Sequence, residues 1–281
     1  MGELAEVATP FVDVEAVDGA SVRVYLDGAQ VASWIPAGGD EQLFVSTRAQ
    51  YGAGVSIRGG IPVCFPQFGP GLLPQHGFAR HCRWRVVELV LGEFVVLELG
   101  RCDLPAQWLE RAAAWPHEFQ AQLRVEVSGS SLELTLQVTN TDRVPFEFTT
   151  ALHPYFAVRD ALTARVHGLA GLSYRDALQG GAEFVERGDA VTFPGNVDRV
   201  YYGAPDVLEL HDGDRVLRIE KRGFPDAVVW NPGPEGTASR VDFAPGDERQ
   251  MVCVEAGAIR EPVVLEPGAV WRGTQRMVWQ S

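Results

Sequence analysis

Residues 121–139 read AQLRVEVSGSSLELTLQVT, and this stretch decides the fold class. Apolar and polar side chains alternate over residues 121–127 and again over residues 132–139, a period of two that is typical of half-buried strands. The SGSS segment between them is short and rich in turn-forming residues, as in a tight hairpin. The stretch therefore predicts an antiparallel β-hairpin with one face buried.

The same alternation recurs along the rest of the chain. It is present in SVRVYL (21–26), FVVLEL (94–99), VLELH (207–211), VLRIE (216–220) and MVCVE (251–255). The 30 glycines and 18 prolines lie mostly between these runs, and no long amphipathic helix, repeat or linker is visible. We therefore expect an all-β protein, built as one large antiparallel β-sandwich domain over residues 1–281.

The composition limits which binding partners the protein can have and in which cellular compartment it can work. The 281 residues are 46% hydrophobic, enough for a large core, and the formal net charge of −13 argues against nucleic acid or an anionic membrane surface. No apolar stretch is long enough to span a bilayer, and the start of the chain lacks an export-signal pattern. Four scattered cysteines without a CxxC pair indicate reduced thiols. We expect a cytoplasmic monomer.

The stretch TTALHPYFAV (149–158) contains the first candidate catalytic group, His153. Pro154 restricts the preceding residue and cannot donate to a strand ladder, so the strand should end just after the imidazole. Imidazole is the side chain best suited to exchange protons near neutral pH. The alternative is a strand-end histidine that is simply bonded to backbone.

Glu255 is the second candidate, because it ends the strand MVCVE with apolar residues on both faces and should be partly desolvated. An exposed strand end is an equally good interpretation. His76 precedes a glycine that allows close backbone approach, or it is a surface loop residue. Asp198 could bind hydroxyl groups, or it could form a turn with Arg199 as its ion-pair partner.

Arg58 and Arg80 are the best candidates for binding an anion. Arg58 precedes Gly59 and Gly60, and a guanidinium fork matches the oxygens of phosphate. Ordinary charge pairing with the 37 acidic residues is the alternative. His76 and His81 have no carboxylate or cysteine companion at ligand spacing, so we expect no metal site. Motifs for dinucleotides, nucleoside triphosphates and hydrolase nucleophiles are also missing from the sequence.

The order of several blocks resembles the aldose 1-epimerase superfamily, most closely its glucose-6-phosphate 1-epimerase (hexose-6-phosphate mutarotase) branch. The match spans roughly residues 20–280. The blocks are SIRGGIPVCFPQFG (56–69), LPQHGFARHCRW (73–84), ALHPYFAV (151–158), NVDRVY (196–201), VVWNP (228–232) and RQMVCVEAG (249–257). The loop at 233–249 and the pair Gln67-Phe68 depart from the family pattern.

The resemblance implies a galactose mutarotase-like β-sandwich that needs no cofactor and exchanges the anomers of a hexose 6-phosphate. By position, His153 would be the general acid and Glu255 the general base. His76 and Asp198 would hold the sugar, and Arg58 with Arg80 would hold phosphate. The unperturbed pKa values of glutamate (~4.3) and histidine (~6.5) suit these roles, and neighbouring groups of this kind favour each other's charged form.

Three other interpretations stay open at this point. The protein could be a mutarotase for unphosphorylated aldoses, with Arg58 and Arg80 structural. It could be a non-catalytic carbohydrate-binding β-sandwich or a structural β-domain without a ligand. The combination of His153 and Glu255 favours an enzyme, because binding alone needs no matched acid and base.

Overall fold

A computed structural model describes residues 9–280, whose regular elements are almost all strands. A three-stranded sheet contains β1 (Phe11–Glu15), β2 (Ser21–Tyr25) and β3 (Gln30–Ile35). An eight-stranded sheet has the order β13 (Ala182–Val185), β12 (Ser173–Asp176), β15 (Val197–Tyr201), β18 (Asp226–Asn231), β19 (Met251–Leu265), β9 (Phe146–Leu152) and β4 (Val63–Cys64), with β10 (Tyr155–Ala157) also beside β19. Each strand pairing within these sheets is antiparallel.

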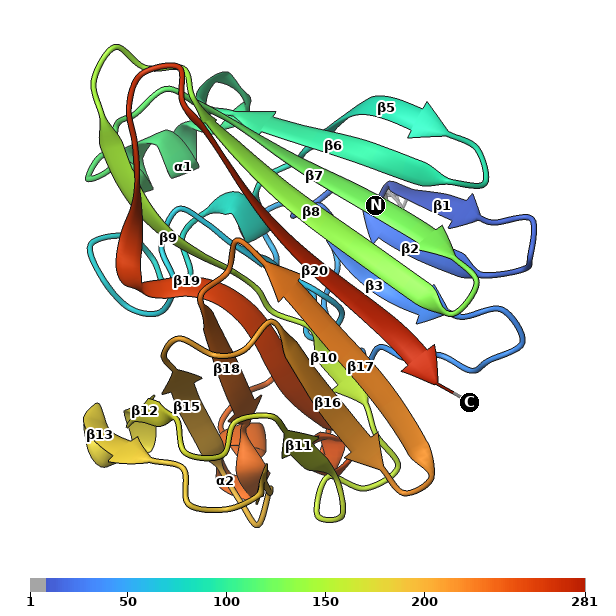
Figure 1. Ribbon diagram of the computed structural model, residues 1–281. Coiled ribbons are helices and arrows are strands. Elements are labelled where there is room, and N and C mark those ends of the chain that lie inside the picture. Colours follow the sequence, from blue (N-terminus) through green and yellow to red (C-terminus); the bar gives the residue numbers. More distant parts are fainter. Residues whose placement is uncertain (1–8, 281) are drawn as a thin grey trace, which may run out of the picture.

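The third sheet has nine strands and forms the face seen in Figure 1. Its order is β14 (Ala190–Val191), β11 (Arg165–His167), β16 (Val207–Asp212), β17 (Arg215–Arg222), β20 (Val270–Gln280), β8 (Ser131–Asn140), β7 (Phe119–Ser128), β6 (Phe94–Gly100) and β5 (Arg85–Val90). The helices are short: α1 (Ala106–Arg111), α2 (Gly233–Ala238) and the 3-10 turns Ala79–His81, Arg101–Asp103, Ala177–Gln179 and Asp247–Arg249. The predicted all-β antiparallel class is confirmed.

The hairpin that decided the fold class is β7–β8. Its strands pair from Phe119 opposite Asn140 to Ser128 opposite Ser131, so the turn lies at the predicted SGSS segment. Buried and partly exposed residues alternate along both strands, as the sequence pattern predicts. The other strands expected from alternation are also present as β2, β6, β16, β17 and β19.

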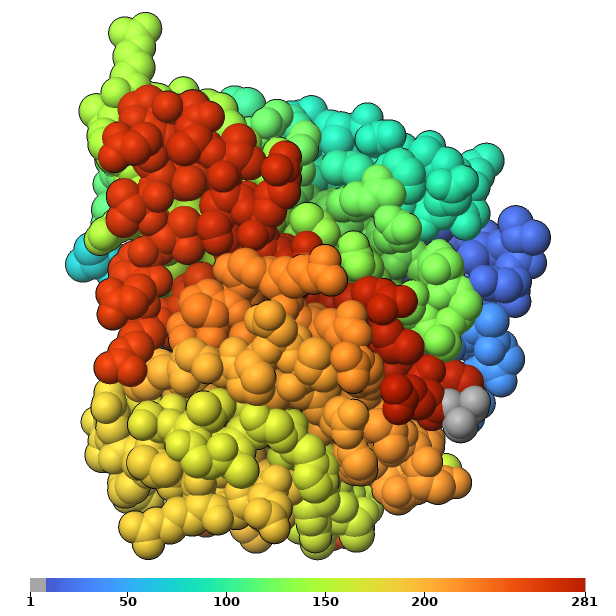
Figure 2. Space-filling model, viewed as in Figure 1, coloured from blue at the N-terminus to red at the C-terminus, as the bar shows by residue number. Residues whose placement is uncertain are grey.

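The core lies between the two large sheets. Leu134 of β8, Ile219 of β17 and Val254 of β19 belong to one continuous cluster of buried apolar side chains. Figure 2 shows the outer face of the nine-stranded sheet, where the red strand β20 runs between green segments from the first half of the chain and orange segments from the second. Burial of apolar surface from both halves is the main force that stabilises this arrangement.

The two faces of the central strand β19 pack against different apolar clusters. Val252 and Val254 point into the main core, whereas Met251 and Cys253 belong to a second small apolar cluster on the opposite side of the sheet. Glu255 follows the alternation of the second set, so it faces away from the main core. The fold therefore presents this carboxylate on the outer face of the eight-stranded sheet.

Two predictions made from the sequence, on membrane-spanning segments and on the cysteines, can be compared with the structure. Within residues 9–280, no helix is long and apolar enough to cross a membrane. All four cysteines are free in the structure, and three of them are buried. Burial raises the pKa of Cys64 and Cys253, which keeps both thiols protonated.

Candidate active site

Strand register brings His153 and Glu255 together, although 102 residues separate them in the chain. In the antiparallel pair β9–β19, Leu152 lies opposite Ala256, so His153, the residue that follows β9, reaches the level of Glu255. The strand ends at Leu152, as the proline after His153 requires. Nε2 of His153 lies 3.3 Å from Oε1 of Glu255.

Burial dominates the electrostatics of this pair. His153 is 7% exposed and Glu255 is 2% exposed. Burial lowers the pKa of His153, and the neighbouring His76, Arg80 and Arg58 lower it further. Burial raises the pKa of Glu255 well above its ordinary value, with a contribution from the charge of Asp198. The sequence argument expected each group to favour the other's charged form, but desolvation outweighs that attraction here.

His76 lies beside His153 as a neutral hydrogen-bonding group. The two imidazole centroids are 5.8 Å apart, and burial together with Arg80 and Arg58 lowers the pKa of His76 to about 3. Its Nδ1 accepts a hydrogen bond of 3.3 Å from the backbone N–H of Gly69, which leaves the proton on Nε2. His76 is therefore neutral, and its Nε2 lies 3.3 Å from the side-chain amide nitrogen of Gln75, which lines the same cleft.

Asp198 is on β15, two strands away from Glu255 in the same sheet. It lies opposite Trp230 of β18, and burial raises the pKa of its carboxyl group. Arg199, the ion-pair partner considered from sequence, contacts Asp176 and Glu186 instead. The Asp198 carboxylate is therefore free of an ion pair with its sequence neighbour and can accept hydrogen bonds from hydroxyl groups.

All six residues singled out from the sequence line one cleft of about 380 Å³. They are Arg58, His76, Arg80, His153, Asp198 and Glu255. The cleft also contains residues for which sequence reasoning assigned no role, namely Phe68, Gln75, Tyr155, Arg175, Trp230 and Arg240. Tyr155 lies in the block ALHPYFAV and Trp230 in the block VVWNP, so their place in these blocks could have marked both as site residues. Nothing in the local sequence pattern marks Arg175.

The segment that carries Arg58 is held by a buried side chain, Gln30. Its amide nitrogen donates to the carbonyl oxygens of Ile57 (2.8 Å) and Gly59 (2.6 Å), and its Oε1 accepts from the Ile57 N–H (3.2 Å). Gly59 has a φ of +124°, and a Cβ there would lie 2.2 Å from the Phe44 carbonyl oxygen. Only glycine allows this approach, so the Arg58-Gly59 sequence fixes where the guanidinium enters the cleft.

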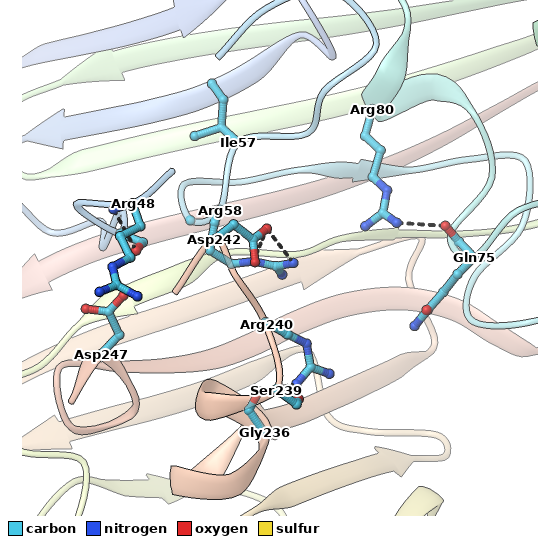
Figure 3. A network of polar contacts seen from close by, with 12 residues as sticks. Arg48, Ile57, Arg58, Gln75, Arg80, Gly236, Ser239, Arg240, Asp242 and Asp247 are labelled. Carbon is cyan, nitrogen blue, oxygen red and sulfur yellow. Dashed lines mark hydrogen bonds and ion pairs between the residues drawn. The ribbon is translucent and has the colours of Figure 1, made fainter. Parts of the chain in front are cut away.

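The guanidinium of Arg58 is held in place by the carboxylate of Asp242 (Figure 3). Nε donates to Oδ2 of Asp242 at 3.1 Å, and Nη2 lies 3.0 Å from the same oxygen. Nη1 donates to the Tyr155 hydroxyl at 3.0 Å. The charge pairing considered as an alternative for Arg58 is therefore present, although its side chain also lines the cleft.

Three other arginines of the cleft have no carboxylate within 4 Å among residues 9–280: Arg80, Arg175 and Arg240. Arg80 donates to the Gln75 carbonyl oxygen at 2.8 Å and to Nε2 of His81 at 3.2 Å. Figure 3 shows Arg58, Arg80 and Arg240 approaching from separate segments. Four arginines against the carboxyl groups of Glu255 and Asp198 make this cleft locally basic in a chain of net charge −13.

The loop at residues 233–249, which departs from the family pattern, forms one wall of the site. It contains α2 and both Arg240 and Asp242. Asn231 fixes its two ends, because its amide donates to the carbonyl oxygens of Glu248 and Met251 and its Oδ1 accepts from the Gly233 N–H, each at 2.8 Å.

Across residues 9–280, no group of three or more His, Cys, Asp or Glu side chains could hold a metal ion.

Known proteins share the sequence of this chain over most of its length. The sequence pattern of the family described as aldose 1-epimerase matches residues 12–278. A protein of Cenchrus ciliaris named "Putative glucose-6-phosphate 1-epimerase" is 41% identical over 265 residues, covering 89% of this chain and 79% of its own length. A protein of the same name from Escherichia coli K12 is 34% identical over 259 residues, covering 89% of this chain and 84% of its own.

A solved structure shares the fold of this chain. The crystal structure of "a putative mutarotase" from Salmonella typhimurium superposes with a TM-score of 0.85 at 29% identity, covering 96% of this chain and 90% of that one. The resemblance found in the sequence blocks and the expected galactose mutarotase-like fold are thereby confirmed. The chain belongs to the aldose 1-epimerase family, whose members are isomerases.

Proposed function

We propose that the protein interconverts the α and β anomers of a hexose 6-phosphate, with glucose 6-phosphate as the substrate. The observation that carries the proposal is the buried pair His153–Glu255, 3.3 Å apart, which lines a cleft together with four arginines. The names of the relatives from Cenchrus ciliaris and Escherichia coli support the phosphorylated substrate.

The chemistry needs one group to take a proton and one to give a proton. Glu255 accepts the proton of the O1 hydroxyl while His153 protonates the ring oxygen, so the hemiacetal opens to an aldehyde. Rotation about C1–C2 presents the other face of the carbonyl, and the two side chains exchange roles as the ring closes. His76 donates to a sugar oxygen, Asp198 accepts from sugar hydroxyls, and Arg58 with Arg80 binds the phosphate.

No metal or organic cofactor enters this scheme, because every proton moves between substrate and side chains. We further propose that residues 1–281 act as one domain and as a cytoplasmic monomer. Both large sheets combine strands from the two halves of the chain, which supports a single domain.

One observation favours a second candidate, a mutarotase for unphosphorylated aldoses. The ion pair with Asp242 offsets part of the charge that Arg58 could offer to a phosphate. A non-catalytic carbohydrate-binding domain is less well supported, because hydroxyl recognition alone does not call for a buried acid–base pair.

Anomer exchange measured by NMR on glucose 6-phosphate and on glucose separates these possibilities. Arg58→Ala and Arg80→Ala should each raise KM for the 6-phosphate about 10- to 100-fold, because charge-assisted bonds to an anion contribute roughly 1.5–3 kcal/mol. Activity on glucose should not fall. Arg272→Ala, at an exposed arginine of β20 outside the cleft, is the matched control.

Three results would decide against the proposal. Equal losses on both sugars would make the arginines structural and favour the unphosphorylated-aldose mutarotase. Binding of the sugar without any exchange would favour the carbohydrate-binding domain. Exchange of glucose with no preference for the 6-phosphate in the unmodified protein would leave the phosphate without a role.

A further inference from the structure

Four adjacent strands of the eight-stranded sheet place one line of side chains across the cleft (Figure 1). Arg175 of β12 lies opposite Val200 of β15. Val228 of β18 lies opposite both Val200 and Glu255 of β19. Directly opposed residues point to the same face of a sheet, and all four line the cleft. Neighbouring strands are roughly 4.8 Å apart, so the Cα atoms of Arg175 and Glu255 are about 14 Å apart, with the two valines between them.

The side chain of Arg175 extends along β12 to the level of Asp198. The register of β12 with its two neighbours puts Gly181 and Asp198 at the same level, one residue beyond the Asp176 end of the strand. A Cβ on Gly181 would lie 3.8 Å from Cδ and 3.9 Å from Nη1 of Arg175, so the guanidinium reaches this level. Burial raises the pKa of Asp198, and the charge of Arg175 counteracts part of that effect.

A gap separates these two side chains. Among residues 9–280, neither Arg175 nor Asp198 has an ion-pair partner within 4 Å, although both line the cleft. A guanidinium only donates and a carboxylate only accepts, whereas a hydroxyl group does both, so sugar hydroxyls can bridge the gap. Arg240, whose charge also acts on Asp198, already donates to the Gly236 carbonyl oxygen at 2.6 Å.

The proposed chemistry determines which edge of the sugar faces this gap. Glu255 takes the O1 proton and His153 protonates the ring oxygen, which is bonded to C1 and to C5. C5 carries the phosphorylated C6, and the proposed phosphate ligand Arg58 lies on the His153 side, because it donates to Tyr155, on which His153 stacks. C2 is the other neighbour of C1, so C2 and C3 lie on the opposite side, above the two valines.

We propose that Arg175 is a specificity-determining residue whose guanidinium donates to the hydroxyl groups on C2 and C3 of the substrate, while Asp198 accepts from the same edge. The inference rests on the proposed function, because it takes the position of C1 from the acid–base pair. The phosphate is then held at one end of the cleft and the C2–C3 edge at the other. When the ring opens, C1 rotates about the C1–C2 bond while the same contacts hold the remainder of the sugar for both anomers.

Deoxy sugars test this contact one hydroxyl at a time. NMR anomer exchange is measured on glucose 6-phosphate and on its 2-deoxy and 3-deoxy analogues, with the unmodified protein and with Arg175→Ala. The substitution should lower kcat/KM for glucose 6-phosphate about 10- to 100-fold, because a charged donor to hydroxyl groups is lost. On each deoxy analogue the loss should be at least about threefold smaller, because one of the two contacts is already missing.

Two further variants separate this contact from general attraction of the phosphate. Arg80→Ala is the matched control: it should lower kcat/KM by the same factor on all three phosphosugars, because its proposed contact does not involve C2 or C3. Arg175→Lys keeps the charge but not the planar fork of donors, so it should recover only part of the discrimination between glucose 6-phosphate and the deoxy analogues. Full recovery by lysine would make Arg175 a general attractor of the anion and overturn the proposal.

The outcomes distinguish this inference from the function on which it rests. Equal losses in Arg175→Ala on all three phosphosugars would overturn the role of Arg175 and leave exchange of glucose 6-phosphate intact. If Arg175→Ala does not fold, Arg175→Lys carries the same comparison. Exchange of glucose but not of its 6-phosphate would overturn the phosphate assignment, and glucose with its 2-deoxy and 3-deoxy analogues would still test Arg175. A protein that exchanges no aldose would overturn both.

Discussion

Glu255→Gln should make the protein much less active and, at neutral and alkaline pH, more stable. The change keeps the shape of a side chain that is 2% exposed but removes its ability to accept a proton. Loss of a general base typically lowers the rate ~10²–10⁴-fold. The stability effect follows from burial, which raises the pKa of Glu255 in the folded protein well above the ~4.3 of the unfolded chain.

The sign and size of that stability effect can be worked out. Below about pH 4 the carboxyl group is protonated in both states, so it does not make stability depend on pH. As pH rises, the unfolded chain releases its proton first, and the unmodified protein loses about 1.4 kcal/mol per pH unit until its folded pKa is reached. Glutamine does not titrate, so the variant avoids this loss.

Urea unfolding between pH 4.5 and 8, together with NMR anomer exchange, measures both effects. The stability advantage of Glu255→Gln should widen with pH by about 1.4 kcal/mol per unit across the window between the two pKa values. Glu261→Gln, at an exposed glutamate of the same strand, should change neither stability nor rate. A stability difference that does not vary with pH, or an exchange rate within about tenfold of normal, would refute the reasoning.

Three further predictions follow from the same structure. His153→Ala should lower anomer exchange ~10²–10⁴-fold while substrate binding, measured by calorimetry, persists; a near-normal rate would remove the proposed acid. Chelators should leave the rate unchanged, and a loss that zinc or magnesium restores would contradict a cofactor-free mechanism. Gly59→Ala should lower the free energy of unfolding by about 1–3 kcal/mol in urea and raise KM for the 6-phosphate, since its Cβ would meet the Phe44 carbonyl oxygen at 2.2 Å. Gly38→Ala, also at positive φ but in open space, should cost less stability and leave KM unchanged.

The sequence by itself determined the fold class, because strand alternation is a local property. A period of two places every second side chain on the same face, so residues 121–139 predict a half-buried hairpin without knowledge of any partner strand. The positions of His153 before a proline and of Glu255 at the end of an apolar run are local in the same way. Six candidate site residues could therefore be named from the sequence, and all six line the cleft.

Only the tertiary structure decided what surrounds these residues. The meeting of His153 with Glu255 depends on the register of β9 with β19, which no short window of sequence specifies. The sign of their pKa shifts was wrong in the sequence argument, because burial of both groups is a property of the packed sheet. The pairing of Arg58 with Asp242, 184 residues away, was also not predictable from either segment alone. Local spacing determines which side chains share a face, whereas long-range strand pairing and desolvation determine which of them meet and in what state of charge.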